Sequence, residues 1–223
     1  DLKGMISPQN SISSLMSYYH KKAPKKNLPL VIYGQDAHQV QRVQKNLPKL
    51  MILVVGETAR AESFSLNGYA KNTNPELSKQ DIFNFSQVSS CGTATAVSVP
   101  CMFSGMPRAD YDEQLASHRE GLLDIAKRAG YQVTWIDNNS GCKGACDRVE
   151  QYQIPEDLKQ KWCKDGECLD DILIDSLKQY LASIPKDDKR PRLVVLHQMG
   201  SHGPAYYKRA PEGYQPFKDR KSV

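Results

Sequence analysis

Glu57 is a residue whose type and position suggest chemistry, because it directly follows an apolar run that ends in Val54-Val55-Gly56. A carboxylate at the end of a buried strand can hold a hard or borderline cation with its oxygens. The alternative is structural, since an acidic residue in the first turn of a helix is stabilised by the helix dipole. The position of Glu57 alone does not choose between these two roles.

The hydroxyl-rich segment 89–101, SSCGTATAVSVPC, offers a candidate nucleophile. If a helix begins near Thr93 to Thr95, its free N–H groups and positive end would stabilise a phosphoryl group and favour an alkoxide. The same position also suits a threonine that only caps the helix. Both interpretations remain open from the residues alone.

Two further side chains stand in glycine-containing loops. His202, in GSHGP, could bind a metal or a phosphate or donate a proton. Lys143 lies between Cys142 and Cys146, where a small disulfide loop could hold its cation in place, although most lysines are simply solvated. His197, inside an apolar run, is expected to be a packed and hydrogen-bonded residue.

The six cysteines form three close pairs in the sequence, which predicts three local disulfides. Metal binding is the alternative, but the spacings do not repeat a CxxC knuckle and few histidines lie nearby. Disulfides imply an oxidising compartment. The predicted pairs are Cys91 with Cys101, Cys142 with Cys146, and Cys163 with Cys168.

The composition limits the classes of protein that the chain can belong to. Its 223 residues suffice for one buried core, and the net charge of +5 is compatible with an anionic partner such as lipid head groups or nucleic acid. The longest apolar run, Leu50 to Val55, is far shorter than the roughly 20 residues of a membrane-spanning helix. We therefore expect a soluble chain whose signal or anchor lies outside the sequence.

Alternating apolar runs and helical patterns predict an α/β layered domain. Strands are expected at Leu50–Val55, Tyr131–Ile136 and Arg192–His197, and helices at Arg119–Ala129 and Leu169–Ile184. In open α/β sheets the ligand crevice lies at the carboxyl ends of the strands. The loops 56–60, 137–139 and 198–203 should therefore meet at the site.

The first 48 residues are polar and irregular, with a short helix expected around Ser11 to Lys21. We expect this stretch to be a lead-in to the domain. The Lys-rich segment 21–26 is interpreted as solvated rather than as an arm that binds nucleic acid.

Four strings, in this order, closely resemble the lipid A phosphoethanolamine transferases: VVGETARAESFSLNGY, SCGTATAVSVPCMFS, DNNSGCKGACD and LHQMGSHGPAYYKR. The family includes the polymyxin-resistance enzymes, and the resemblance spans about Met51 to Lys218. It implies an alkaline phosphatase/sulfatase-like α/β/α domain with a mostly parallel central sheet. Such a domain is normally tethered by N-terminal membrane helices at the periplasmic face of the bacterial inner membrane. Residues 1–48 would then lead in from an absent membrane region, and 49–223 would be the N-terminal part of the catalytic domain.

The resemblance also implies roles for individual residues. Glu57 corresponds to a zinc ligand and Thr95 to the nucleophile and a further zinc ligand, with Thr93 as its nearest rival. Lys143 and His202 match positions around the phosphoethanolamine group, and all six cysteines match structural disulfides. The family completes its zinc site with an Asp-His pair in a later motif, and no Asp-His dipeptide occurs in this sequence. The expected site is therefore incomplete within the chain.

The implied activity is zinc-dependent transfer of phosphoethanolamine to lipid A through a phosphothreonine intermediate, which gives polymyxin resistance. The donor would be a phosphatidylethanolamine-like phospholipid, and nucleic acid is not expected as a partner. Two alternatives remain open. One is a related phosphatase or sulfatase that passes the group to water, and the other is a non-catalytic domain that binds anionic head groups.

Overall fold

The structure is a computed structural model that describes residues 11–12, 15–16, 28–39, 49–203 and 208–211. It divides into two compact units, Asp1–Val31 and Ile32–Val223. In the first unit, residues 11, 12, 15 and 16 are helical, and the rest of the helix predicted around 11–21 lies outside the described residues. The predicted boundary at residue 48 stays a prediction.

Part of the expected lead-in is attached to the larger unit. The Arg128 guanidinium donates hydrogen bonds to the carbonyls of Tyr33 and Gly34 at 2.9 and 3.0 Å, and the side chain of Gln39 donates to the Ala129 carbonyl at 2.7 Å. Residues 33–39 therefore lie against the end of helix α4 (Leu122–Arg128).

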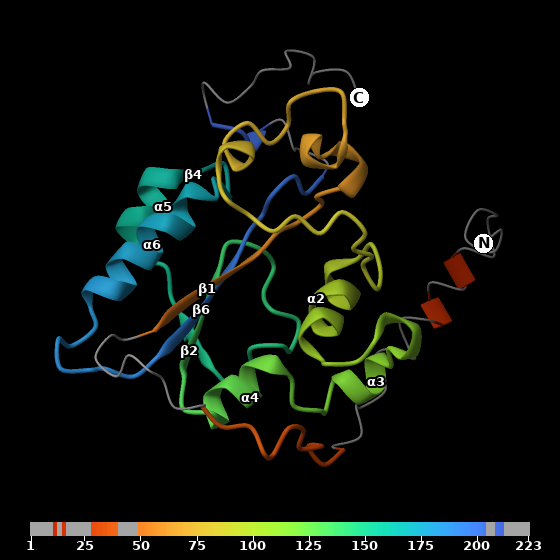
Figure 1. The fold of residues 1–223 in the computed structure, drawn as a ribbon, viewed down its shortest axis with the longest axis vertical. Helices are drawn as coiled ribbons and strands as arrows, with labels where there is room; N and C mark the ends of the chain where they lie inside the picture. The colour runs from red at the N-terminus through yellow and green to blue at the C-terminus, as the bar shows by residue number, and fades with distance from the viewer. Residues whose placement is uncertain (1–10, 13–14, 17–27, 40–48, 204–207, 212–223) are drawn as a thin grey trace. The chain divides into compact units, whose positions relative to one another are not determined.

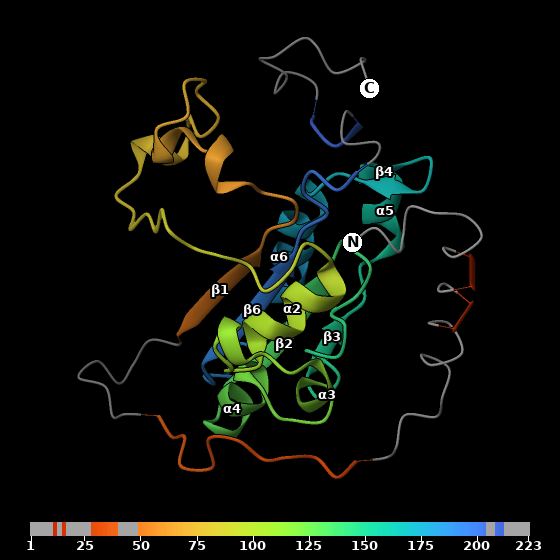
Figure 2. The same ribbon diagram turned by 90° about the vertical axis from the view of Figure 1, so that its right-hand side faces the viewer.

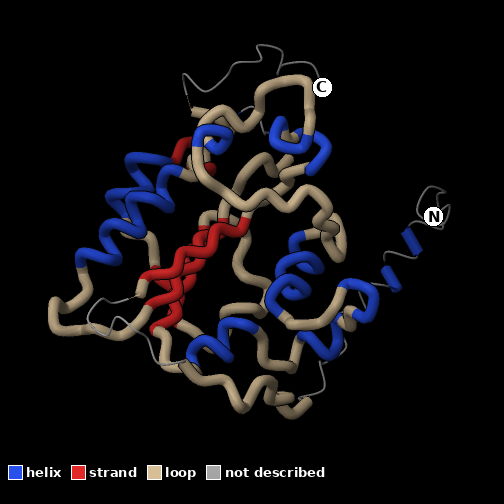
Figure 3. The backbone as a smooth tube through the Cα atoms, in the orientation of Figure 1, coloured by secondary structure: helices blue, strands red, loops and turns tan. Residues whose placement is uncertain are grey.

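The central sheet has the strand order β1-β6-β2-β3 among the described residues, and all of its strands are parallel (Figures 1 and 3). Its strands are β1 (Leu50–Val55), β6 (Arg192–His197), β2 (Gln132–Asp137) and β3 (Glu150–Tyr152). The strands predicted at 50–55, 131–136 and 192–197 are confirmed. The sequence gives no comparable indication of β3, because this strand has only three residues and they carry polar groups.

β1 differs from the buried strand that its apolar sequence predicts. It pairs only with β6 among the residues described, so one edge has no partner there. Ile52 and Val54 are 44% and 52% exposed, whereas Val55 is only 2% exposed. The expectation of a buried strand is wrong for this structure because apolar composition reports propensity and not position in the sheet.

Helices cover both faces of the sheet (Figures 1 and 2). On one side lie α2 (Thr95–Phe103), α3 (Glu113–Ala116) and α4, and on the other lie α5 (Glu156–Trp162) and α6 (Asp171–Ala182). The helices predicted at 119–129 and 169–184 correspond to α4 and α6 with shorter bounds. The shorter α3 and α5 were not predicted. Together the layers form an α/β fold.

Short elements complete the larger unit. In the part of the chain that the structure describes, 3-10 turns span Ala61–Ser63 (η2), Ser65–Asn67 (η3), Leu77–Lys79 (η4) and Arg108–Asp110 (η5). An antiparallel ribbon consists of β4 (Cys163–Lys164) and β5 (Glu167–Cys168). Among the described residues, no helix is both long and apolar enough to cross a membrane.

The alternation of side chains along the strands produces two hydrophobic layers. Trp135 and Val195 belong to the layer beneath α2 and α4, with Phe103 at 5.6 Å from Trp135 between ring centroids. Ile136 and Leu196, the next residues along each strand, belong to the layer beneath α6. Burial of one such side chain contributes about 1.5–3 kcal/mol, so the two layers together fix the positions of the strands.

The three predicted disulfide pairings are confirmed, since the structure joins Cys91–Cys101, Cys142–Cys146 and Cys163–Cys168. The first ties the hydroxyl-rich segment to α2. The second closes a loop after β2, and the third links the two strands of the β4–β5 ribbon.

An ion pair attaches the loop after β2 to the start of α4. The Arg148 guanidinium donates to both carboxylate oxygens of Asp124, at 2.6 and 2.7 Å, and the Gly121 amide donates to Asp124 at 2.9 Å. Burial raises the pKa of Asp124, but the hydrogen bonds from Arg148 and Gly121 lower it further, so the net shift is downward. The carboxylate therefore stabilises the fold in its ionised form.

Replacing this carboxylate tests its contribution. Asp124→Asn should lower the free energy of unfolding by about 2–3 kcal/mol at pH 7, because the Arg148 bonds lose their charged acceptor. Because the folded pKa lies below the unfolded value of about 3.9, the native contribution is present above that value and is lost as pH falls below it. The difference in free energy of unfolding between the native protein and the variant, measured with urea, should therefore be smaller at pH 3 than at pH 7.

The exposed Asp187 provides the control. Asp187→Asn should change the free energy of unfolding by less than about 0.5 kcal/mol. If Asp124→Asn lowered the free energy of unfolding equally at pH 7 and pH 3, the stabilising role of the ionised Asp124 carboxylate would be contradicted.

Candidate active site

The loops after β1, β2 and β6 meet at the carboxyl edge of the sheet, as the sequence predicts. The Gln198 amide donates to the Val55 carbonyl and the Asn138 amide donates to the His197 carbonyl, both at 2.9 Å, so the pairing continues past the strand ends. The side-chain amide of Asn139 then donates to the Gln198 carbonyl at 2.8 Å. These bonds hold the three loops side by side.

Thr95 is the first residue of α2, and its hydroxyl donates a hydrogen bond of 2.8 Å to the Glu57 carboxylate. The preceding residue, Ala94, is the N-cap and has no side-chain capping bond. Thr95 is therefore directed at Glu57 and does not cap its own helix. Thr93, its rival, is exposed and makes no side-chain hydrogen bond within the described residues.

The N-terminus of α2 presents unpaired donors beside the Thr95 hydroxyl. The amides of Val97 and Ser98 both donate to the Ala94 carbonyl at 2.9 Å, while those of Thr95 and Ala96 have no partner among the described residues. Free N–H groups and the positive end of the helix dipole attract anionic oxygens. The site can therefore bind a phosphoryl group where the Thr95 hydroxyl could reach it.

The Glu57 carboxylate is held in place by several groups. Thr58 donates to one oxygen at 2.7 Å, and the side chain of Asn139 lies 3.4 Å from the other. Partial burial raises the pKa of Glu57, but the hydrogen bonds from Thr58, Thr95 and Asn139 and the charge of His202 lower it to below its ordinary value. Glu57 is thus an ionised acceptor. It lies before the 3-10 turn η2 and is not part of a helix, so it is not stabilised by a helix dipole of its own.

Thr58 adopts an unusual backbone conformation, with a φ of +54°. This left-handed region is disfavoured for a β-branched residue. The hydroxyl of Thr58 bonds to Glu57 in this conformation. The strained turn therefore helps to direct the carboxylate toward α2.

Asp137 and Asn139 form a supporting layer that the sequence motifs indicate only as a loop. Asp137 accepts from the Trp135 indole at 2.7 Å, from the Asn139 amide at 2.7 Å and from His197 Nδ1 at 3.0 Å. His197 has no exposed surface, which confirms that it is packed and hydrogen-bonded. Burial raises the pKa of Asp137, but the bonds from His197 and Trp135 more than offset this effect.

His202 and Lys143 lie in the loops where the sequence placed them. His202 is exposed, its ring bonds to the Gly203 carbonyl at 2.8 Å, and its charge reaches Glu57. Lys143 is also exposed, and its ammonium donates to the Ser140 carbonyl. The structure thus associates His202 with Glu57 but records no contact between Lys143 and that carboxylate in the described part of the chain.

The residues present fit part of a metal site. Glu57 and Thr95 bring two oxygens to one point, and the low pKa of Glu57 keeps the carboxylate available as a ligand. No group of three or more His, Cys, Asp or Glu side chains suited to a metal occurs among the described residues. Because structural and catalytic zinc sites use three or four protein ligands, these two oxygens fit a zinc ion only in part.

Comparison with known proteins decides the family. A family model described as "Sulfatase" matches residues 49–222. The chain belongs to the sulfatase family. It is also homologous to the phosphoethanolamine transferase EptA of Salmonella typhimurium, with 50% identity over 214 residues that cover 95% of this chain and 38% of the relative.

Two further relatives are similar to this chain over most of its length. It is 39% identical to phosphatidylethanolamine transferase Mcr-2 of Escherichia coli, over 95% of this chain and 40% of the relative. The structure of the integral membrane lipooligosaccharide phosphoethanolamine transferase A of Neisseria meningitidis matches with a TM-score of 0.83 and 42% identity, over 95% of this chain and 39% of that one. The chain therefore spans about two fifths of the length of these relatives.

Gly200 allows the loop after β6 to approach the Glu57 backbone closely. Its φ is +54°, and a Cβ there would lie 2.4 Å from the Glu57 carbonyl oxygen. The amides of Met199 and Gly200 donate to the two oxygens of Asp170 at 2.8 Å, which fixes the turn. Only glycine fits this approach.

Gly200→Ala should lower the free energy of unfolding by about 1–3 kcal/mol, because the new methyl group must displace backbone. Gly203→Ala is the matched control in the same loop, since a Cβ there meets no described atom within 4 Å. It should cost less than about 0.5 kcal/mol. Urea unfolding of both variants measures the difference, and equal losses would mean that Gly200 is not held against Glu57.

Proposed function

We propose that the protein containing this chain transfers phosphoethanolamine from a phospholipid to lipid A, with Thr95 as the nucleophile. The observation that carries the proposal is the 2.8 Å bond from the Thr95 hydroxyl to the ionised Glu57 at the N-terminus of α2. The names of the relatives, phosphoethanolamine and phosphatidylethanolamine transferases, support the transferred group and the donor. The three disulfides support a periplasmic location, because they need an oxidising compartment, and we propose that the domain works at the periplasmic face of the inner membrane.

In the first step the Thr95 hydroxyl loses its proton to solvent, and its oxygen attacks the donor phosphorus. An oxygen–phosphorus bond forms, the bond to the glycerol oxygen breaks, and diacylglycerol leaves after that oxygen takes a proton. Glu57 orients the hydroxyl, and the free amides of Thr95 and Ala96 stabilise the charge on the phosphoryl oxygens. The product is a phosphothreonine that carries ethanolamine.

In the second step a phosphate oxygen of lipid A attacks the same phosphorus. The bond to Thr95 breaks, and the threonine oxygen regains a proton. Addition of phosphoethanolamine gives lipid A an ammonium group and reduces its net negative charge, which weakens attraction to cationic polymyxin and would produce resistance.

Zinc is the proposed cofactor. Glu57 and Thr95 would hold it together with ligands outside the described residues, and when bound it would act as a Lewis acid and lower the pKa of the threonine hydroxyl. His202 and Lys143 are proposed to lie around the phosphoethanolamine group. The exposed His202 can supply a proton to the leaving oxygen, and Lys143 can turn toward the phosphate from its present bond to Ser140.

The match to the family model described as "Sulfatase" favours one second candidate, a hydrolase that passes the group to water. It would use the same nucleophile and the same first step. Transfer to lipid A and release of free phosphoethanolamine separate the two activities. A domain that only binds anionic head groups would do neither.

Substitutions at the nucleophile test the proposal in the full-length protein. Thr95→Ala and Glu57→Ala should each reduce lipid A modification by more than about a thousandfold, because the covalent step or its orientation is lost. Thr93→Ala is the control for a nearby hydroxyl and should retain most activity. Mass spectra of lipid A from cells carrying each variant measure the outcome, and normal modification by Thr95→Ala would overturn the proposal.

The metal assignment has a separate readout in the 223-residue chain. Glu57→Ala should weaken zinc binding by more than about tenfold in competition with a chelating dye, because one of two oxygen ligands is removed. Glu62→Ala removes an exposed carboxylate that pairs with Arg60, so it should leave zinc affinity unchanged. Equal affinity in all three proteins would show that zinc binds elsewhere.

A further inference from the structure

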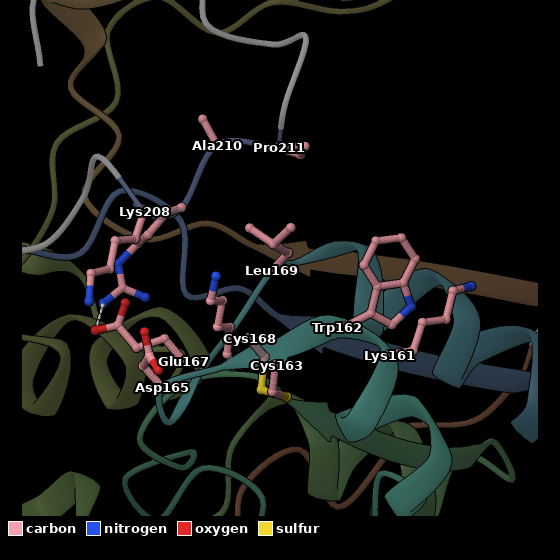
Figure 4. Close-up of a pocket in the computed structure, with 12 residues that line it drawn as sticks. Lys161, Trp162, Cys163, Asp165, Glu167, Cys168, Leu169, Lys208, Ala210 and Pro211 are labelled. Atoms are coloured by element: carbon pink, nitrogen blue, oxygen red, sulfur yellow. Dashed lines mark hydrogen bonds and ion pairs between the residues drawn. A yellow bond between two sulfur atoms is a disulfide. The ribbon is translucent and has the colours of Figure 1, made fainter.

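A pocket separate from the candidate active site lies between the β4–β5 ribbon and residues 208–211 (Figure 4). Its volume is about 440 Å³, within the range of about 300–1,000 Å³ that small-molecule sites occupy. We call it the ribbon pocket. The residues that line it include Trp162, Lys164, Glu167, Leu169, Lys208 and Arg209.

Arg209 connects the ribbon pocket to the candidate active site and retains an unpaired donor. Its Nε donates to the His202 carbonyl at 2.8 Å, and its Nη2 lies 3.3 Å from a Glu167 oxygen. The side chain is only 10% exposed. Its Nη1 is buried and has no hydrogen-bond partner in the part of the chain that the structure describes. Buried guanidinium nitrogens are normally paired, so this one indicates a missing acceptor.

Glu167 presents the opposite requirement. Its second carboxylate oxygen, Oε2, is buried and has no donor among the described residues. A bare anion could satisfy Arg209 but would repel this oxygen. A ligand that carries both an anionic oxygen and a neighbouring hydroxyl would satisfy both groups.

The remaining lining favours an anion. Lys164 and Lys208 are exposed and have no partner in the described ranges, whereas Lys161 pairs with Asp175 at 2.7 Å. Figure 4 shows Lys208 near Glu167 and Asp165 at one end of the pocket and Trp162 at the other. Cations therefore outnumber carboxylates on the lining. The Lys161 ammonium lies over the Trp162 ring, 4.5 Å from its centroid, so the indole lines the pocket as part of the cationic wall.

We propose that the ribbon pocket binds a phosphorylated sugar. The phosphate would pair with Arg209, Lys164 and Lys208, and a sugar hydroxyl would donate to Glu167. Because Arg209 bonds to the loop that carries His202, the pocket adjoins the transfer site. We assign this sugar to the phosphorylated head group of the acceptor, and this assignment rests on the proposed function.

Binding of glucose 1-phosphate to the 223-residue chain, measured by titration calorimetry, tests the proposal. It should bind at least about tenfold more tightly than sulfate or glucose, because sulfate has no hydroxyl to donate to Glu167 and glucose has no anionic oxygen for Arg209. The double substitution Lys164→Gln/Lys208→Gln alters exposed side chains and should weaken binding by about tenfold. Lys186→Gln/Lys189→Gln removes the same charge from two exposed lysines that do not line the pocket and should not weaken it.

Two further arms separate the possible outcomes. Thr95→Ala should leave the affinity for glucose 1-phosphate unchanged, so failure of the proposed nucleophile would not affect this result. Loss of binding in Thr95→Ala, or normal binding in the Lys164/Lys208 variant, would overturn the ribbon pocket as the site. Vesicles that contain lipid A should displace glucose 1-phosphate, and failure to do so would refute the assignment to the acceptor.

Discussion

The in-register pairing of β6 between β1 and β2 is the constraint on which the site depends. His197 on β6 aligns with Val55 on β1 and with Asp137 on β2, so the three strands end at one level. The loops that follow carry Glu57, Asn139 and Gln198 and are joined by side-chain hydrogen bonds. A slip of one residue would turn the alternate side chains to the opposite faces and mix the two core layers.

The position of α2 then brings a threonine hydroxyl to this edge. The Cys91–Cys101 disulfide ties the preceding loop to the helix, and Thr95 at the first helical position faces the Glu57 carboxylate. The same helix end supplies free amides. The Thr95 hydroxyl, the ionised Glu57 carboxylate and the free amides of α2 thus lie together in this structure.

The sequence predicted the elements whose patterns are long and regular. The apolar runs located β1, β2 and β6 almost to the residue, because each run is bounded by polar loops. It did not predict β3, α3 or α5, since three to seven polar residues carry little periodicity. It also overestimated the burial of β1, because an apolar run does not reveal whether a strand has one neighbour or two.

The motifs indicated the residues of the site better than their supporting contacts. Glu57, Thr95 and His202, which the structure brings together, were visible from position, motif and family resemblance, and the role of Lys143 stays a prediction. The roles of Asn139 and Asp170 depend on contacts between segments 29 to 82 residues apart, as in the Asn139–Glu57 and Met199–Asp170 bonds. Such contacts follow from tertiary packing and have no local pattern in a single sequence.

The most direct measurement of the central claim is to incubate the full-length protein with a phosphatidylethanolamine donor in the absence of lipid A. The protein is then digested, and its peptides are sequenced by mass spectrometry. The account predicts a phosphoethanolamine adduct on Thr95, because the acceptor that would discharge it is missing. An adduct on Thr93, or consumption of the donor without any adduct on the hydroxyl-rich segment, would contradict it.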